Sequence, residues 1–246
     1  MCGILGIFNL DKTNVSSKLL GAMGQKIAHR GPDDEGYFVS HNIGLLHKRL
    51  AILDPTDNGK QPMYSQDGKW VLVFNGCIYN FKELREELIE KGCSFRSDSD
   101  TEVIVEGFSV YGPAFSERFN GMFAIGAWNR KEEKLYLIRD RYGIKPLYYW
   151  FNGKTIVFSS EIKSIIEHPD YSIDVDLDAL NEYFTFQNIF SYNTLFKGVQ
   201  MLPPANRVEI NEESTYVKHH SWWDYDFSAT YDSISFDEAK RETKLL

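Results

Sequence analysis

The sequence predicts a layered α/β sandwich, in which two packed β-sheets carry helices on their outer faces. Several strand-like segments are apolar throughout, residues 71–74 and 123–125 among them, which is typical of strands covered on both faces. Helical patterns punctuate these strands, with apolar residues recurring at three- and four-residue spacing. Doubly covered strands combined with amphipathic helices favour two stacked sheets between helical layers.

The expected strands are short, apolar-rich runs. They comprise residues 2–9, 43–47, 70–75, 122–128, 134–138, 147–151 and 155–159, followed by a strand pair at 207–210 and 215–218. The segment Leu202-Pro203-Pro204 separates that pair from the rest, because proline cannot continue a strand ladder. After the pair the chain becomes aromatic and acidic.

The apolar spacing of residues 19–27 predicts a first helix. Later helix starts carry capping signals: Asn80-x-x-Glu83, Ser99-x-x-Glu102, Asp176 and Ser235-x-x-Glu238. Gly92 ends the helix that follows Asn80. The helix that begins after Ser235 reaches the last residue before it is complete, so we expect this chain to be the front part of a longer polypeptide.

The composition is that of an ordinary globular protein, 43% hydrophobic and 25% charged, with a net charge of −8 over 246 residues. No run of Lys and Arg points to a nucleic acid or a membrane surface as partner. The three cysteines, Cys2, Cys77 and Cys93, lack metal-ligand spacing and fit a reducing compartment better than a disulfide framework. Without a membrane-length apolar run or a signal peptide, the expected location is cytoplasmic.

Cysteine is the second residue of the chain. Cells generally remove an initiator Met when the next side chain is small, and Cys2 would then carry both a thiol and a free α-amine. An α-amine has an ordinary pKa of about 7.7–8.0 and accepts protons near neutrality. One residue would supply the nucleophile and its base. The alternative is a small buried cysteine at the start of a strand, and these first residues leave both possibilities open.

Two polar segments at strand ends are candidate site elements. Residues 30–36, Arg-Gly-Pro-Asp-Asp-Glu-Gly, indicate a turn when taken alone. Residues 47–54 contain Arg49, whose apolar neighbours suggest that its charge needs a partner. Its guanidinium would either hold a carboxylate through paired hydrogen bonds or form a surface salt bridge.

Two further segments carry amide and carboxylate groups. Asn75-Gly76 ends a buried strand and leads into a helix, so a hairpin turn fits poorly there. The Asn75 side-chain amide beside the Gly76 N–H is suited to donating to an oxyanion. Asp100 stands in the first turn of a helix, where the helix dipole alone would explain a carboxylate.

A series of short motifs occurs in one order along the chain. They are Cys2-Gly-Ile, Arg30-Gly-Pro-Asp, His47-x-Arg-Leu, Gln61-Pro, Asn75-Gly-x-Ile-Tyr-Asn, Ser99-Asp-x-Glu, Gly121-Met-Phe-Ala, Arg139-Asp-x-x-Gly-Ile-x-Pro-Leu-Tyr and Ser159-Ser-Glu-Ile-Lys. Together they resemble the glutaminase domain of class II glutamine amidotransferases, in the asparagine synthetase branch. The resemblance covers roughly residues 2–210. Each motif alone is weak evidence, but their occurrence together in this order makes the resemblance specific.

The resemblance implies a four-layer αββα N-terminal-nucleophile hydrolase that converts L-glutamine to L-glutamate and ammonia. Cys2 would attack the substrate amide and form a γ-glutamyl thioester, with Asn75 and the Gly76 N–H holding the oxyanion. Arg49 would bind the substrate α-carboxylate, and Asp100 would bind its α-ammonium. The backbone of the segment after Arg49 would line the pocket, namely Leu50, Ala51, Ile52 and Leu53.

This sequence departs from the family motif at position 77, where Cys77 stands in place of the usual Glu. The change removes an acceptor close to the substrate ammonium and adds a second thiol near the pocket. It puts the affinity for glutamine in doubt rather than the identity of the nucleophile.

The resemblance also implies a division of the chain. Residues 2–210 would form the glutaminase domain, and residues 211–246 would form a linker and the first turns of a helix leading to a synthetase domain outside this chain. That domain would require ATP and magnesium, whereas no cofactor or metal is expected here, because the family's Ser-Gly-Gly-x-Asp-Ser loop is missing from these residues.

The expected partners are L-glutamine and the synthetase domain. The sequence leaves open whether the chain forms a homodimer. The ammonia would go to aspartate by default, or to a sugar carboxylate in surface polysaccharide synthesis. A non-catalytic glutamine-binding module is the remaining alternative, and Cys77 is the one feature in its favour.

Overall fold

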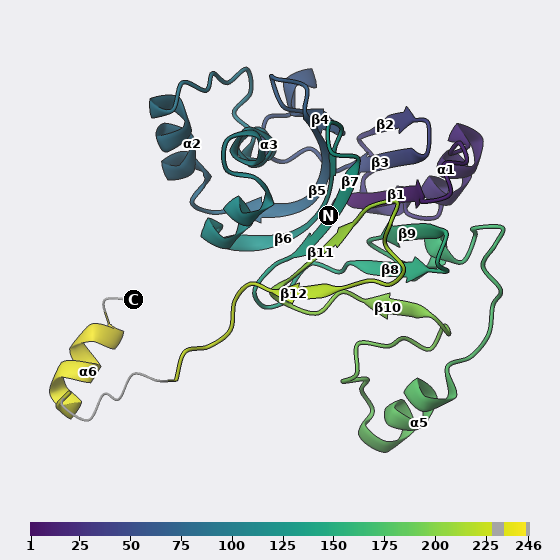
Figure 1. Cartoon of the computed structure of the whole chain (residues 1–246). Helices are drawn as coiled ribbons and strands as arrows, with labels where there is room; N and C mark the ends of the chain where they lie inside the picture. Colours follow the sequence, from purple (N-terminus) through teal and green to yellow (C-terminus); the bar gives the residue numbers. More distant parts are fainter. Residues whose placement is uncertain (228–233, 245–246) are drawn as a thin grey trace.

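Two six-stranded sheets stacked face to face form the body of the molecule, with helices against their outer faces (Figure 1). The computed structural model describes residues 1–227 and 234–244. The layers follow the order helix, sheet, sheet, helix, which confirms the predicted sandwich.

The first sheet has the strand order β10-β8-β9-β1-β3-β2, and all its neighbouring strands are antiparallel. Its strands are β1 (Gly3–Asn9), β2 (Asp34–Ser40), β3 (Ile43–Arg49), β8 (Tyr148–Phe151), β9 (Thr155–Ser159) and β10 (Val199–Met201). β1 lies between β9 and β3, where Ile4 is opposite His47 and Leu5 is opposite Ser159. The start of β1 therefore lies at one end of the sheet, beside the end of β3.

The second sheet has the order β12-β11-β7-β6-β5-β4 and is also antiparallel throughout. Its strands are β4 (Met63–Tyr64), β5 (Trp70–Ile78), β6 (Gly121–Asn129), β7 (Lys134–Arg139), β11 (Asn206–Ile210) and β12 (His219–Ser221). β5 pairs with β6 along its whole length, with Asn75 opposite Ala124 and Gly76 opposite Phe123.

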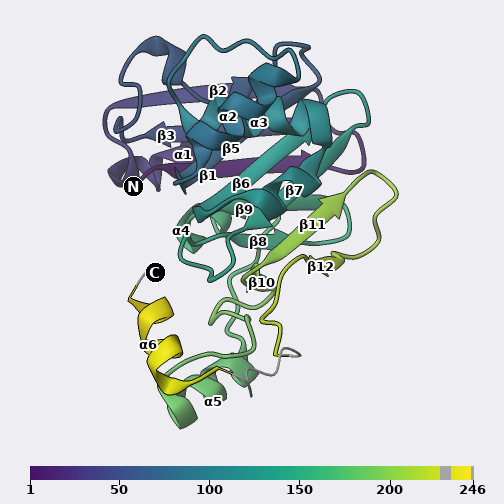
Figure 2. The same ribbon diagram turned by 90° about the vertical axis from the view of Figure 1, so that its left-hand side faces the viewer.

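Helices α1 (Ser17–Gln25) and α4 (Ile162–Ile165) pack on the outer face of the first sheet, and α2 (Phe81–Glu90) and α3 (Asp100–Tyr111) pack on that of the second. Short 3-10 turns occur at Ala28–Arg30, Asp57–Gly59 and Pro113–Arg118. α5 (Leu177–Phe186) and α6 (Phe236–Thr243) lie outside the sandwich in both views (Figure 2). No helix in the described ranges is long and apolar enough to cross a membrane.

Three apolar clusters fill the spaces between the four layers. The cluster between the sheets takes alternate residues of each strand, such as Val71 and Val73 of β5. The intervening residues Leu72 and Phe74 face α3 on the other side. This alternation explains why β5 is apolar throughout, because each of its faces is covered.

The space between the sheets is set by an aromatic ring that rests on glycine. Phe158 of β9 is fully buried and lies against Gly6 of β1 and Gly126 of the opposite sheet. A Cβ at Gly6 would lie 2.2 Å from the Phe158 ring, and a Cβ at Gly126 would lie 2.3 Å from it. Both contacts are far shorter than van der Waals distance, so only glycine fits at either position.

Four details of the expected elements are wrong. β5 continues through Ile78 instead of ending at residue 75, because residues 75–78 pair with β6. β2, between residues 34 and 40, replaces part of the expected turn because it pairs with β3 in a hairpin. The second strand of the tail pair lies at His219–Ser221, not at 215–218, because its register is set by pairing with Asn206–Val208.

The fourth incorrect detail concerns the residues that cap the helices. Asn80 does not cap α2; its side chain instead accepts from Asn120 N at 2.8 Å and donates to Arg118 O at 3.1 Å. Ser99 does cap α3, through Thr101 N at 3.1 Å. Glu102 completes no capping box, since its carboxylate accepts hydrogen bonds from the loop before Ser99. At Asn80, long-range partners thus replace the local one that the sequence predicts, whereas Glu102 binds a nearby loop instead of the Ser99 N–H.

Candidate active site

A cavity of about 270 Å³ opens where the start of β1 meets the ends of β3 and β5. All of the predicted site residues line it except Ala51, whose N–H bonds to Asp33 Oδ2 at 2.8 Å. The structure therefore brings together residues that are separated by up to 98 positions in the chain (Cys2 to Asp100). Cys2 directly precedes β1 of the first sheet, and Asn75 belongs to β5 of the second.

The Cys2 thiol lies against the backbone of Leu50. Its Sγ is 3.4 Å from Leu50 N and 3.6 Å from Leu50 O, and the Cys2 carbonyl accepts a hydrogen bond from Arg30 Nε at 3.0 Å. Burial raises the pKa of the Cys2 thiol, against the opposing effects of the Leu50 N–H and nearby positive charge. The resting thiol is therefore protonated near neutrality, and its attack on a substrate requires a base.

Asn75 presents an unused donor to the cavity. The residue is 2% exposed, and its Nδ2 has no hydrogen-bond partner among the described residues. Buried amide groups normally find partners, so an unpaired one in a cavity points to a ligand atom. Gly76 adjoins it on β5, and a Cβ there would lie 2.2 Å from Met122 O, which restricts the position to glycine.

Arg49 lies at the end of β3 and is almost completely buried. Its Nη1 donates to Thr56 O at 3.0 Å and its Nη2 donates to Asp54 O, so the guanidinium holds the loop that follows it. Leu50, Ile52 and Leu53 in this loop line the cavity. Arg49 thus forms no surface salt bridge, because its guanidinium is buried and donates to backbone carbonyls.

Asp100 is the first residue of α3 and is 3% exposed. Burial raises the pKa of its carboxyl to about 6, although hydrogen bonds from Ile78 N, at 3.0 Å, and from Thr101 oppose the rise. Burial makes ionisation of this carboxyl group unfavourable, and a cation placed beside it would favour the ionised form. The cavity therefore has a guanidinium on one side and a carboxyl group on another.

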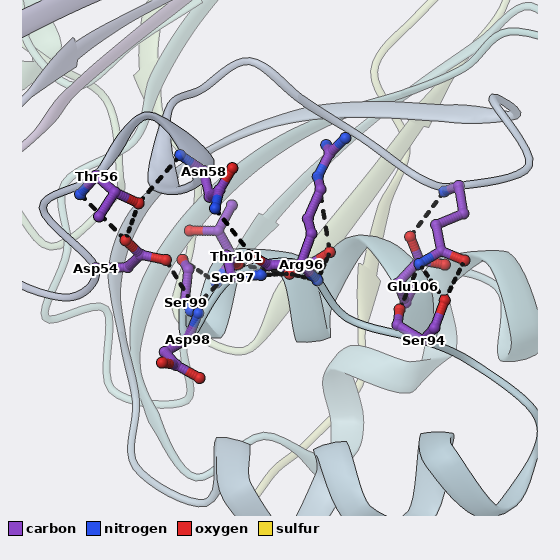
Figure 3. A network of polar contacts seen from close by, with 12 residues as sticks. Asp54, Thr56, Asn58, Ser94, Arg96, Ser97, Asp98, Ser99, Thr101 and Glu106 are labelled. Carbon is purple, nitrogen blue, oxygen red and sulfur yellow. Dashed lines mark hydrogen bonds and ion pairs between the residues drawn. The ribbon is translucent and has the colours of Figure 1, made fainter.

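The loop after Arg49 and the loop before Asp100 are tied to each other (Figure 3). Asp98 N donates to Asp54 Oδ2 at 3.0 Å, and Asn58 Nδ2 donates to Arg96 O at 3.0 Å. This network fixes the separation of the two oppositely charged groups, because each loop ends at one of them.

Cys77 is half-buried on the same cavity wall. Burial and the carboxyl of Asp100 raise the pKa of its thiol, while the ammonium of Lys145 works in the opposite direction. All three cysteines are free thiols, and Cys93 lies apart from the cavity, against the cluster under α2 and α3.

Several residues that line the cavity have no role predicted from the sequence. They include His47, Gln61, Thr101, Met122 and Lys145. His47 is 1% exposed, neither ring nitrogen has a hydrogen-bond partner among the described residues, and burial lowers its pKa to about 3. His47 is therefore neutral. Its place in the His47-x-Arg49 motif was the only signal in the sequence.

Lys145 is 6% exposed and its Nζ lies 3.3 Å from the sulfur of Met1. The initiator residue thus occupies part of the cavity beside a buried ammonium. Within the described ranges, no group of three or more His, Cys, Asp or Glu side chains is arranged to hold a metal ion.

Two sheets between helices, with a cysteine at the head of a central strand and its thiol in a cavity, define an N-terminal-nucleophile hydrolase fold. The chain belongs to the glutamine amidotransferase domain family, whose model matches residues 1–223. The solved structure of glutamine phosphoribosylpyrophosphate amidotransferase from Bacillus subtilis shares this fold, with a TM-score of 0.64 and 18% identity over 89% of this chain and 49% of that one.

Curated relatives refine the comparison. The chain is 40% identical to asparagine synthetase [glutamine-hydrolyzing] 1 and 36% identical to asparagine synthetase [glutamine-hydrolyzing] 2 of Bacillus subtilis, over 89% and 91% of its length. It is 31% identical to amidase chry2 of Gibberella zeae over 90% of its length. These matches cover 35%, 30% and 32% of the respective relatives, so the chain spans about a third of their length.

Proposed function

We propose that this chain hydrolyses L-glutamine to L-glutamate and ammonia through a thioester on Cys2. One observation carries the proposal: a half-buried thiol, an unpaired amide donor, a guanidinium and a buried carboxyl group line a single cavity. This is the set of groups that amide hydrolysis of a free amino acid requires. Membership of the glutamine amidotransferase family supports it.

The reaction begins after removal of Met1, which frees the α-amine of Cys2. The amine takes the thiol proton, and Sγ attacks the substrate Cδ to give a tetrahedral intermediate whose oxyanion is held by Asn75 Nδ2 and Gly76 N–H. The intermediate collapses to the thioester as the amine returns the proton to the leaving nitrogen, and ammonia departs. Water, deprotonated by the same amine, then cleaves the thioester and restores the thiol.

Substrate recognition uses both charged ends of glutamine. The guanidinium of Arg49 binds the α-carboxylate, and the carboxylate of Asp100 binds the α-ammonium. A glutamine within a peptide lacks both charges, so the site selects the free amino acid. Because the two loops are joined by the Asp54–Asp98 contact, the distance between the two ends is fixed before the substrate arrives.

The ammonia passes to a synthetase domain in the same full-length polypeptide. Relatives named asparagine synthetase, about three times as long as the match, support such a domain and favour aspartate as the acceptor. ATP and magnesium would serve that domain and not this chain. A sugar carboxylate as acceptor would be distinguished by supplying candidate acceptors to the full-length polypeptide.

The direct test measures glutamate and ammonia release by the chain that mass spectrometry shows to begin at Cys2. Cys2→Ala should abolish release yet still bind glutamine in calorimetry, because the charged binding groups lie elsewhere. Cys93→Ala, which removes a thiol away from the cavity, is the matched control and should retain full activity. Release by Cys2→Ala, or full activity in a chain that keeps Met1, would overturn the mechanism; binding without release in the parent would identify a non-catalytic module.

A further inference from the structure

The backbone of the nucleophile is held by a side chain that does not line the cavity. Once Met1 is removed, Cys2 is joined to the chain through one peptide bond only, so its position depends on non-covalent contacts. The Cys2 carbonyl accepts from Arg30 Nε at 3.0 Å. Arg30 does not line the cavity, and its side chain is 9% exposed.

Arg30 depends in turn on one carboxylate. Its Nη1 donates to Glu161 Oε1 at 3.0 Å, and within the described part of the chain this is its one ion pair. The remaining nitrogen, Nη2, is buried without a partner. A nearly buried guanidinium with a single counter-charge loses most of its compensation when that charge is removed.

The turn that carries Glu161 also holds the residues just after the nucleophile. Ser160 N donates to Ile4 O at 2.9 Å, and Ser160 Oγ accepts from Ile4 N at 3.0 Å. Ser159 Oγ donates to Ile4 O at 3.2 Å. The Ser159-Ser160-Glu161 turn thus extends the β1–β9 pairing toward Cys2, and the serine hydroxyl takes the place of a strand carbonyl.

Glu161 is ionised in this setting. Burial works to raise its pKa, but hydrogen bonds from Arg30, Lys163 and His29 outweigh it and hold the pKa below the usual range of a carboxyl group. Lys163 lies 3.0 Å from Oε2 and His29 lies 2.9 Å from Oε1, so Glu161 is anchored by three cationic or proton-donating groups.

We propose that Glu161 is a positioning residue for the nucleophile, acting through Arg30 on the Cys2 carbonyl; the inference rests on the proposed glutaminase function. Glu161 touches neither the cavity nor the groups that bind the ends of the substrate. Its loss therefore leaves glutamine binding intact and displaces the thiol from its line of attack. A displacement of about 1 Å costs on the order of 10²-fold in rate.

The test compares Glu161→Ala with Glu161→Gln in chains that begin at Cys2. Glu161→Ala should lower kcat by about 10- to 100-fold with KM within about 2-fold of the parent value. Glu161→Gln keeps an acceptor for Arg30 without the charge and should recover part of kcat. A purely structural role would instead move both parameters together with the melting temperature.

Glu167→Ala is the matched control. Glu167 forms a neighbouring ion pair with Lys26 at 2.9 Å, and it shares no ion pair with Arg30 or Glu161 within the described residues. This variant should stay within about 2-fold of the parent kcat, as expected for an exposed ion pair.

Hydrogen exchange gives a second readout that does not require activity. The amides of Gly3 and Ile4 should exchange about tenfold faster in Glu161→Ala than in the parent, because the first residues of β1 lose their anchor. Unchanged kcat and unchanged exchange in Glu161→Ala would overturn the inference. An inactive parent would overturn the proposed function instead, and the exchange rates would then decide whether Glu161 holds Cys2.

Discussion

The carboxyl group of Asp100 is tuned by burial to a pKa of about 6, which places its titration inside the range of ordinary assays. Only the ionised form attracts the ammonium of glutamine. The α-amine of Cys2 gives both kcat and kcat/KM a first acid limb near its ordinary pKa of about 7.7–8.0. We expect kcat/KM for glutamine to fall more steeply once the pH is lowered through about 6, since this ratio reports the free enzyme. In kcat this second step should lie at lower pH, because bound ammonium stabilises the carboxylate.

Asp100→Asn tests this assignment in two ways. It should remove the second step near pH 6, leave the limb of the Cys2 α-amine in place, and raise KM at least tenfold, since a charge-assisted contact is lost. The folded pKa lies above the unfolded one, so Asp100 favours folding below about pH 4 and loses that contribution, on the order of 3 kcal/mol, as the pH rises through 6. Asp100→Asn should therefore raise the melting temperature at pH 8 and have little effect on it at pH 4.

Cys77 is the second residue whose contribution can be isolated. Cys77→Glu adds a carboxylate to a wall that is within the electrostatic influence of both the carboxyl of Asp100 and the ammonium of Lys145. The ammonium of the proposed substrate would attract the added charge. We expect KM for glutamine to fall by about tenfold with kcat nearly unchanged, because the contact is made equally in the ground and transition states. Cys77→Gln matches the size without the charge, and an equal fall in KM for it would contradict the electrostatic explanation.

The loop between β7 and β8 is held by the buried side chains of Arg139, which donates to Gly143 O and Lys145 O, and of Asp140. Asp140 is fully buried, and its two oxygens accept hydrogen bonds from Phe123 N, Tyr142 N, Ile144 N and Lys145 N at 2.9–3.1 Å. This arrangement fixes the loop to β6 and directs Lys145 into the cavity.

Asp140→Ala should destabilise the chain by about 3 kcal/mol or more, because buried N–H groups lose a charged acceptor. Urea unfolding measures the change. Asp178→Ala, at an exposed position in the first turn of α5, is the control and should stay within about 0.5 kcal/mol. Equal midpoints for the two variants would show that the loop is held by other contacts.

The sequence predicts the strands better than it predicts their ends. Hydrophobic alternation identifies β5, but its continuation through Ile78 depends on pairing with β6, which is distant in the chain. Asn80 has the residue type of a cap and is instead recruited by Asn120, forty positions away. Local patterns report burial and turn chemistry, whereas partners brought together by the fold decide where an element stops.

The residues of the site likewise divide into those that local sequence motifs predict and those that only the fold brings together. Cys2, Arg49, Asn75 and Asp100 could be predicted because each belongs to a motif with a chemical reason. Lys145 gave no such signal, since its position beside Met1 arises only when the loop after β7 folds over the start of β1.

The cavity is assembled from two sheets whose spacing depends on the Phe158 ring. Gly126→Ala would place a methyl group 2.3 Å from that ring and push the sheets apart. We expect a loss of about 1–3 kcal/mol of stability and a fall in kcat larger than the rise in KM. The proposed nucleophile, next to β1, and the proposed oxyanion donor, on β5, are held by opposite sheets, while Arg49 and Asp100 are tied by their loops.

Gly21→Ala provides the control for this experiment. Gly21 lies in α1, where the nearest atom to an added Cβ is 3.9 Å away, so alanine should stabilise the helix by about 0.5–1 kcal/mol and leave kcat unchanged. Gly126→Ala with parental kcat would show that the sheet spacing does not govern the reaction.

The division of the cavity between the sheets also has a consequence for heat inactivation. Warming that lets the two layers slide over each other leaves every hydrogen bond within a sheet intact, so far-ultraviolet circular dichroism would register nothing. Cys2 and Asn75 would nevertheless lose their alignment, because no strand pairing connects β1 to β5. Glutamine turnover should therefore be lost several degrees below the melting temperature measured by circular dichroism, and it should return at once on cooling. Loss of activity would then report the relative position of the two sheets before any change in secondary structure.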